Sequence, residues 1–242
     1  MKVSKGPTFM FNQKVVVITG DQSGIGKCIK ESFENDGAIV CGIDIQEGSY
    51  YHGDIADEKV LKTFVSKVIT QYKKVDIIVN NALPIMKGIN DCTYEEFQYA
   101  LSVGITAPFY LVKLLKPHLN KDASIVNICS TRAAISQAQT ESYSAAKGGV
   151  HALTHAMAVS LSGIARVNAI SPGWIDTTNT NFEGANAYQH PAGRVGKPED
   201  IAQMVKFLCS DDAAFITGEN ITIDGGMSKL MIYHNDQGWT LQ

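Results

Sequence analysis

The chain has 242 residues, of which 45% are hydrophobic and 19% are charged, and its formal net charge is −3. This composition supports a full hydrophobic core without disulfides, and we expect a single domain over residues 1–242. The slight negative charge, without a cluster of Lys and Arg, argues against a surface that binds nucleic acid.

The cysteines and the hydrophobic segments indicate a cytoplasmic protein. The five cysteines form no CxxC pair, which favours reduced thiols over a disulfide framework or a zinc site. No segment approaches the roughly 18 apolar residues that cross a membrane, and the first residues hold no apolar leader region. We therefore expect neither a membrane nor a metal as a partner.

Short apolar runs rich in β-branched residues alternate along the chain with segments of helical length. The runs predict strands over 14–20, 37–44, 75–81, 123–130, 165–171 and 219–226, and helices are expected over 24–36, 56–73, 93–118, 143–162 and 198–210. Continuous apolar runs are typical of parallel strands that are buried on both faces. The alternation predicts an α/β fold: a three-layer, doubly wound parallel sheet of about seven strands with helices on both faces.

Three segments lack a clear period. Residues 1–12 are expected to form an N-terminal extension, and residues 229–242 a C-terminal tail, whose Trp239 points to docking on a neighbouring subunit or pocket. Residues 174–193 make a long loop, and a loop of this length in a compact domain is usually functional. We expect it to be the substrate loop.

A glycine-rich loop follows the first predicted strand. Gly20, Gly24 and Gly26 lie between that strand and the first helix, with the spacing Gly-x-x-x-Gly-x-Gly. Glycines there let the backbone approach a pyrophosphate, which binds to free N–H groups at the helix N-terminus. A glycine triplet alone is also common in ordinary turns, so the strand before it and the helix after it carry the interpretation.

Asp44 ends the second predicted strand, 18 residues after Gly26. A carboxylate about 20 residues beyond the loop accepts hydrogen bonds from an adenosine ribose, and it repels a 2′-phosphate. Because Ser23 and Ile45 put no basic side chain beside it in sequence, we predict NAD as the cofactor, with NADP as the alternative. The competing interpretation is an aspartate that only caps a turn.

Tyr143 and Lys147 stand four residues apart in a predicted helix, so they share one face. An isolated pair of this kind is most often a surface feature. Ser130 changes the interpretation, because it ends a predicted strand and the carboxyl ends of parallel strands border the ligand crevice. The three side chains are therefore expected beside the glycine loop.

Several motifs occur together with Asp44 and Ser130: TGDQSGIG (19–26), GDI (53–55), NNA (80–82), YSAAK (143–147), RVNAISPG (166–173) and ITIDGG (221–226). In this combination the chain resembles the short-chain dehydrogenase/reductase superfamily, in its single-domain Rossmann form, from about residue 12 to residue 228. The resemblance implies an NAD-dependent oxidoreductase that interconverts a secondary alcohol and its ketone by hydride transfer. It also implies a homotetramer or a homodimer.

In this family the catalytic roles fall on the positions of Ser130, Tyr143 and Lys147. Tyr143 would be the general acid/base. Lys147 and a positive nicotinamide would lower the phenol pKa from its ordinary value of about 10, and Lys147 would also hold the nicotinamide ribose. Ser130 would orient the substrate oxygen and stabilise charge on it. The resemblance places the cofactor on Gly20, Ser23, Gly24, Ile25, Gly26, Asp44, Asp54, Ile55, Asn80, Ala82, Tyr143, Lys147, Pro172, Gly173, Ile175 and Thr177.

Two positions depart from the family pattern. Leu83 and Pro84 follow the NNA motif where a glycine is usual, which changes the wall beside the cofactor. Gly104 replaces an asparagine that is thought to hold a water in a proton relay to Lys147. Our hypothesis is that the relay persists through the Gly104 carbonyl with reduced turnover, and that Gly104→Asn raises turnover.

Two other functions stay open at this stage. The first is a dinucleotide-binding protein without activity, with a role in sensing or assembly, which Gly104 favours and the intact set of Ser130, Tyr143 and Lys147 opposes. The second is another reaction on the same scaffold, such as an epimerisation or a dehydration.

The substrate pocket is expected to be formed by residues 84–89, 134–141, Trp174 and 178–193. In this set, Trp174, Phe182 and Tyr188 favour an apolar or ring-shaped substrate. His190, in the loop, is a candidate contact to the substrate.

His151 and His155 have the i, i+4 spacing of a metal-ligand pair. Packing or contact with solvent is the preferred interpretation, because the six histidines of the chain do not otherwise form a metal-binding set.

Overall fold

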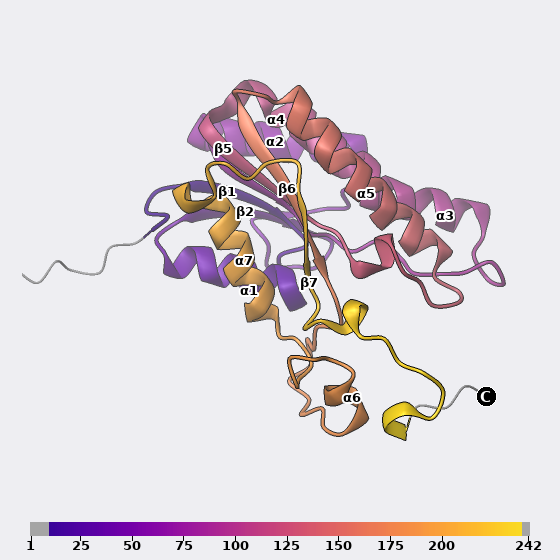
Figure 1. Cartoon of the computed structure of the whole chain (residues 1–242). Coiled ribbons are helices and arrows are strands. Elements are labelled where there is room, and N and C mark those ends of the chain that lie inside the picture. The colour runs from indigo at the N-terminus through magenta and orange to yellow at the C-terminus, as the bar shows by residue number, and fades with distance from the viewer. Residues whose placement is uncertain (1–9, 239–242) are drawn as a thin grey trace, which may run out of the picture.

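The computed structural model describes residues 10–238, and its centre is a seven-stranded sheet in the order β3-β2-β1-β4-β5-β6-β7. Every neighbouring pair of strands is parallel. The strands are β1 Val15–Thr19, β2 Ile39–Asp44, β3 Tyr51–His52, β4 Val75–Asn80, β5 Leu119–Ile128, β6 Ala165–Pro172 and β7 Asn220–Ile223. The predicted doubly wound, Rossmann-type α/β fold is confirmed (Figure 1).

Helices cover both faces of the sheet (Figure 1). One face carries α1 (Gly24–Asn35) and α7 (Pro198–Cys209), and the other carries α2 (Glu58–Tyr72), α4 (Ala107–Leu115) and α5 (Glu141–Ser160). The three layers follow from the connections between parallel strands, each of which must cross one face of the sheet.

The side chains of β1 show how the two cores form. Val15 and Val17 belong to the core beneath α2 and α4, whereas Val16 and Ile18 belong to the core beneath α1 and α7. Successive side chains of a strand point to opposite faces, so an unbroken apolar run is needed to fill both layers. This explains why the central strands were recognisable in the sequence.

Three elements differ from the expectation. The predicted helix over 93–118 is divided into α3 (Tyr94–Leu101), the π-helical turn η1 (Ser102–Thr106) and α4. β5 begins at Leu119 instead of residue 123, because the exposed Lys121 and Asp122 interrupt the apolar run. β3 has only two residues, too few for any periodic pattern.

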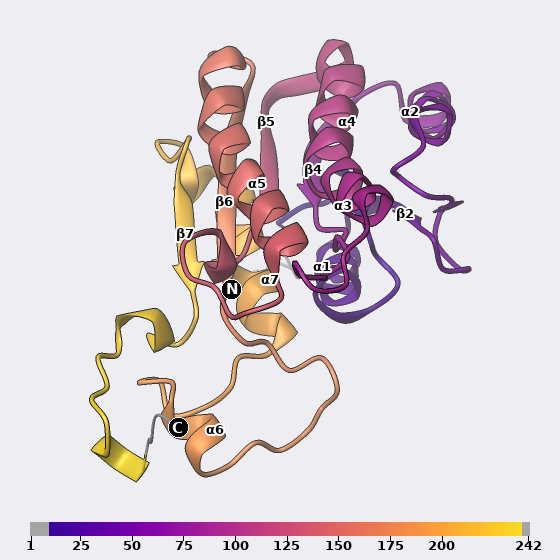
Figure 2. The same cartoon turned by 90° about the vertical axis from the view of Figure 1, so that its right-hand side faces the viewer.

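Two segments extend beyond the carboxyl ends of β6 and β7 (Figure 2). One contains the short helix α6 (Ala185–Tyr188), and the other contains the turns η5 (Met227–Lys229) and η6 (Asp236–Gly238). The predicted substrate loop thus lies at the edge of the sheet where parallel strands end. The predictions for residues 1–9 and for Trp239 fall outside the described residues.

None of the helices in the described range combines the length and the apolar character that a membrane span requires.

Candidate functional site

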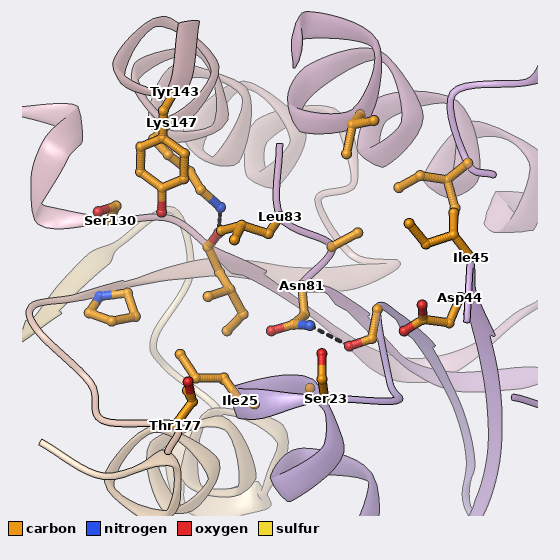
Figure 3. Close-up of a pocket in the computed structure, with 18 of the residues that line it drawn as sticks. Ser23, Ile25, Asp44, Ile45, Asn81, Leu83, Ser130, Tyr143, Lys147 and Thr177 are labelled. Carbon is orange, nitrogen blue, oxygen red and sulfur yellow. Dashed lines mark hydrogen bonds between the residues drawn. The ribbon is translucent and has the colours of Figure 1, made fainter. Parts of the chain in front are cut away.

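A cavity of about 510 Å³ lies at the carboxyl edge of the sheet (Figure 3). Its wall includes Gly20 after β1, Asp44 at the end of β2, Asn81 after β4, Ile128 at the end of β5 and Pro172 at the end of β6. A doubly wound sheet binds its ligands at this edge, beside the point where the strand order reverses, here between β1 and β4.

Most of the residues expected at the cofactor lie in this wall. They are Gly20, Ser23, Gly24, Ile25, Gly26, Asp44, Asp54, Ile55, Ala82, Tyr143, Lys147, Pro172, Gly173, Ile175 and Thr177. Tyr99 of α3 also lines the cavity and donates its hydroxyl to Oδ2 of Asp54 at 2.9 Å. The sequence held no signal for Tyr99, because only the packing of α3 against α5 brings it to the site.

Asn80 is the one expected cofactor residue outside the wall, and Asn81 lies there instead. Asn80 is buried, and its Nδ2 donates to Oδ1 of Asn127 at 2.8 Å. Asn127 in turn donates to Oγ1 of Thr154 at 2.9 Å, so this chain of side chains joins β4, β5 and α5. Neighbouring side chains alternate in direction along a strand, which sends Asn80 into the layer and Asn81 towards the cavity.

The glycine loop is held by close packing and by Asn81. A Cβ on Gly26 would lie 1.8 Å from the carbonyl oxygen of Gly20, and Gly20 itself has a φ of +73°. Asn81 Nδ2 donates to that same oxygen at 2.8 Å (Figure 3). Because α1 begins at Gly24, its free N–H groups open onto the cavity, and they suit a pyrophosphate.

Asp44 is fixed at the end of the cavity that lies away from Tyr143 and Lys147 (Figure 3). It is 6% exposed, and its carboxylate accepts hydrogen bonds from the backbone N–H groups of Gln22 at 3.0 Å and Gln46 at 2.9 Å. In the described wall of this cavity, Lys147 is the single basic residue. The Asp44 end can therefore accept hydrogen bonds from ribose hydroxyls, and it offers no cation to a 2′-phosphate.

Ser130, Tyr143 and Lys147 meet at the opposite end (Figure 3). Ser130 follows β5 and accepts a hydrogen bond from the backbone N–H of Arg132 at 3.1 Å. Tyr143 and Lys147 come from the first two turns of α5, and the Lys147 Nζ lies 5.5 Å from the centre of the Tyr143 ring. Lys147 is buried, and its Nζ donates to the carbonyl oxygen of Ile128 at 2.7 Å.

Burial controls the protonation of both ionisable groups. It raises the pKa of Tyr143 above its ordinary value, while the hydrogen bond with Ser130 and the charge of Arg132 act in the opposite direction. Burial also lowers the pKa of Lys147 to about 8. The chain's own groups therefore do not give Tyr143 the lowered pKa that we expected from Lys147, whose ammonium is engaged with a backbone carbonyl.

Gly104 lies close to Pro84 and to Ala146 of the YSAAK motif. Gly104 lies in the π-helical turn η1, and a Cβ placed on it would be 2.6 Å from Cβ of Ala146 and 3.4 Å from Cγ of Pro84. Ala146 thus occupies the space that a side chain at residue 104 would need, while Pro84 lies at ordinary contact distance. The hypothesis that Gly104→Asn raises turnover is therefore revised.

We expect Gly104→Asn to lower both the melting temperature and the turnover. Forcing a side chain against Ala146 costs about 1–3 kcal/mol of stability, as overpacked cores generally do. Thermal unfolding and steady-state kinetics measure the two effects. The matched control is the double variant Gly104→Asn/Ala146→Gly, which removes the contacting methyl group and should recover stability relative to Gly104→Asn. A single variant that is as stable as the parent would contradict this account.

A second cavity, of about 920 Å³, adjoins the first and shares with it Leu83, Ser130, Tyr143, Gly173 and Ile175. Its other lining residues are Pro84, Ile85, Met86, Lys87, Thr131, Arg132, Ile135, Ser136, Gln137, Trp174, Gln189 and Met227. Ser130 and Tyr143 therefore face both spaces, which is the position that a group acting between cofactor and substrate requires.

The expected substrate pocket agrees with this cavity only in part. Residues 84–87, residues 135–137 and Trp174 line it, but Gln189 is its single lining residue from 178–193. The ring of Phe182 packs against the ring of Trp174, with ring centres 4.7 Å apart, and Tyr188 is exposed. His190 is 2% exposed, and its Nδ1 lies 3.1 Å from the carbonyl oxygen of Asn186, so it packs inside the loop.

His151 and His155 are both exposed on α5. Within residues 10–238 no group of His, Cys, Asp and Glu is arranged to hold a metal ion.

Comparison with known proteins agrees with this arrangement. The sequence profile of the family described as Enoyl-(Acyl carrier protein) reductase matches residues 20–228. An uncharacterized oxidoreductase of Thermotoga maritima is 39% identical over 254 residues, covering 93% of this chain and 99% of the relative.

Two solved structures show the same fold. An apo SCOR enzyme from Clostridium thermocellum is 46% identical with a TM-score of 0.89, covering 95% of this chain and 98% of its own. A short-chain dehydrogenase/reductase named as a glucose/ribitol dehydrogenase, from Brucella melitensis, is 30% identical with a TM-score of 0.84, covering 91% of this chain and 99% of its own.

Proposed function

The chain belongs to the short-chain dehydrogenase/reductase superfamily, and we propose that it is an NAD-dependent oxidoreductase that interconverts a secondary alcohol and its ketone. The observation that carries this proposal is the meeting of Ser130, Tyr143 and Lys147 where the two cavities join. A proton donor, a hydroxyl and an ammonium at one point are what transfer of a proton to a carbonyl oxygen needs.

The first cavity fits a dinucleotide. The backbone of the close-packed glycine loop forms part of the cavity wall, the N-terminus of α1 suits the pyrophosphate, and Asp44 suits an unmodified ribose. Lys147 would hold the nicotinamide ribose, and Pro172, Gly173, Ile175 and Thr177 would line its carboxamide end. The cofactor, when bound, supplies the acceptor or donor of a hydride.

Tyr143 would move the proton between its own hydroxyl oxygen and the substrate oxygen. Its raised pKa keeps the phenol protonated at neutral pH, ready to donate a proton during reduction. During oxidation it would accept the alcohol proton, and a positive charge brought next to it would ease that step. Ser130 would hold the substrate oxygen by a hydrogen bond. Residues 83–87 and Trp174 would exclude water from the second cavity.

The proposal is tested by incubating the protein with NAD⁺ or NADP⁺ and a panel of secondary alcohols, polyols, sugars and hydroxysteroids, with absorbance at 340 nm as the readout. Reduction of NAD⁺ by at least one member supports the proposal. NADH binding without turnover on the whole panel would favour the alternative, a dinucleotide-binding protein without activity. Gly104, which lacks the side-chain amide of the family asparagine, is the feature that favours this alternative.

Asp44→Ala is expected to raise the ratio of kcat/KM for NADP⁺ over NAD⁺ by about 10- to 100-fold. This change corresponds to the loss of one charge-assisted hydrogen bond to the ribose and of the repulsion between the carboxylate and a 2′-phosphate. The double variant Asp44→Ala/Ile45→Arg should raise the ratio further, because it adds a cation at the exposed Ile45 in the cavity wall. Ile45→Arg alone is the matched control and should raise it least. A parent protein that prefers NADP⁺ would overturn the role of Asp44.

Assembly and location are part of the same proposal. We propose a cytoplasmic location, and we propose that the chain forms a homotetramer or a homodimer. The assembly is supported by an exposed strip of small side chains on α5, which consists of Ala145, Ala152 and Ala156. Gly149 does not contribute to this strip, because it packs against Ile105 of its own chain.

A further inference from the structure

Arg132 places a positive charge beside the reacting groups. Its backbone N–H donates to Oγ of Ser130 at 3.1 Å, and its side chain lines the second cavity. The guanidinium contacts only neutral acceptors: Nη1 donates to Sδ of Met86 at 3.4 Å, and Nη2 donates to Oε1 of Gln137. A thioether is a weak acceptor, so much of the hydrogen-bonding capacity of this group is left for another partner.

The other two arginines of the chain are paired within the fold. Arg194 forms a two-point ion pair with Asp200, with both N–O distances at 2.7 Å. Arg166 donates to the carbonyl oxygens of Leu208 and Ser210. Arg132 has no ion pair with a described carboxylate, and its charge reaches Tyr143, where it opposes the rise in pKa that burial causes.

The second cavity contains no acid to neutralise Arg132. No Asp or Glu is found among its described lining residues. The other basic lining residue, Lys87, is occupied by Glu96, with Nζ and Oε1 2.5 Å apart. A guanidinium that is partly removed from water without a counter-ion is unfavourable, and a ligand carboxylate would offset that cost.

We propose that the substrate is a hydroxy acid, or the corresponding keto acid, whose carboxylate binds Arg132 while its alcohol carbon lies at Ser130 and Tyr143. The proposal rests on the proposed function for the reacting end of the substrate. A planar guanidinium matches a carboxylate by two parallel hydrogen bonds. Pro84, Ile135, Trp174 and Met227 supply apolar walls for the carbon skeleton between the two ends.

The test measures binding without turnover. The chain has two tryptophans, and Trp239→Phe leaves Trp174, in the cavity wall, as the single tryptophan, whose fluorescence is the readout. In this background the protein is titrated with two matched pairs, benzoate against benzamide and butyrate against butyramide, with NAD⁺ present. We expect each acid to bind about 10-fold or more tightly than its amide.

Arg132→Gln should abolish this preference by weakening the acids and leaving the amides within about twofold. Lys121→Gln is the charge-matched control, because Lys121 is exposed at the opposite end of β5, and it should keep the preference. Equal affinities for acid and amide, a preference that survives Arg132→Gln, or no saturable binding of either acid would overturn the proposal.

The outcomes separate this inference from the proposed function. A carboxylate preference that depends on Arg132, in a protein that oxidises no alcohol with either cofactor, would keep the anion site and reject the oxidoreductase. Turnover of neutral alcohols without any carboxylate preference would support the oxidoreductase and reject the anion site. Turnover of hydroxy acids in preference to their amides, lost in Arg132→Gln, supports both.

Discussion

Tyr143→Phe is expected to lower kcat by about 10³-fold or more, in the range that loss of a general acid/base produces. The change removes one oxygen from a side chain that lines both cavities, and it leaves the ring that packs above Lys147. Without the hydroxyl, the site loses the group that we propose as proton donor and acceptor for the substrate oxygen, and Ser130 alone remains beside that oxygen. Steady-state kinetics with the best alcohol of the panel measures the loss.

The affinity for NADH and the melting temperature of Tyr143→Phe should stay close to those of the parent. Tyr94→Phe is the matched control: this residue is 74% exposed at the start of α3 and should retain full turnover. Retention of more than a tenth of the parent turnover by Tyr143→Phe would contradict the assigned role.

Gly26→Ala is expected to destroy the dinucleotide site and to destabilise the fold. The added Cβ would lie 1.8 Å from the Gly20 carbonyl oxygen and 2.4 Å from Nδ2 of Asn81, so the loop must move away from Asn81. We expect a cost of about 3 kcal/mol, near the upper end for overpacked sites, and a fall in Tm of roughly 10 °C. Thermal unfolding and titration with NADH measure the two losses.

Gly148→Ala is the matched control for this substitution. Gly148 lies within α5, and a Cβ on it would meet no atom within 4 Å apart from its chain neighbours and the adjacent backbone of its own helix. Replacing a helical glycine by alanine in open space stabilises a protein by about 0.5–1 kcal/mol, so Tm should rise slightly with NADH affinity unchanged. If Gly26→Ala has the same melting temperature and the same affinity for NADH as the parent, the loop is not packed as described.

Gly104 shows how the packing around a residue decides the effect of a substitution. A Cβ on Gly104 would lie 2.6 Å from Cβ of Ala146. The π-helical turn Ser102–Thr106 contacts α5 directly, beside the contact between α3 and α5. Asparagine at residue 104 alone therefore meets the side chain of Ala146.

The sequence determined the fold class and most members of the site. Strands of a buried parallel sheet must be apolar on both faces, so the apolar runs 15–18 in β1 and 77–79 in β4 were visible in the sequence. Gly20, Asp44 and Ser130 follow or end such strands, and parallel strands end at a common edge; their meeting in one cavity was therefore predictable before any coordinates.

Only the tertiary structure decided which of two neighbouring residues faces the site and how tightly the site residues are packed. It selected Asn81 over Asn80, brought Tyr99 and Arg132 to the cavities, and closed the space beside Gly104. It also showed that burial raises the pKa of Tyr143, where the spacing with Lys147 had suggested the opposite. The physical reason is the same in each case. Spacing along the chain determines which residues share an element, whereas direction, distance and desolvation depend on what packs against that element from elsewhere in the fold.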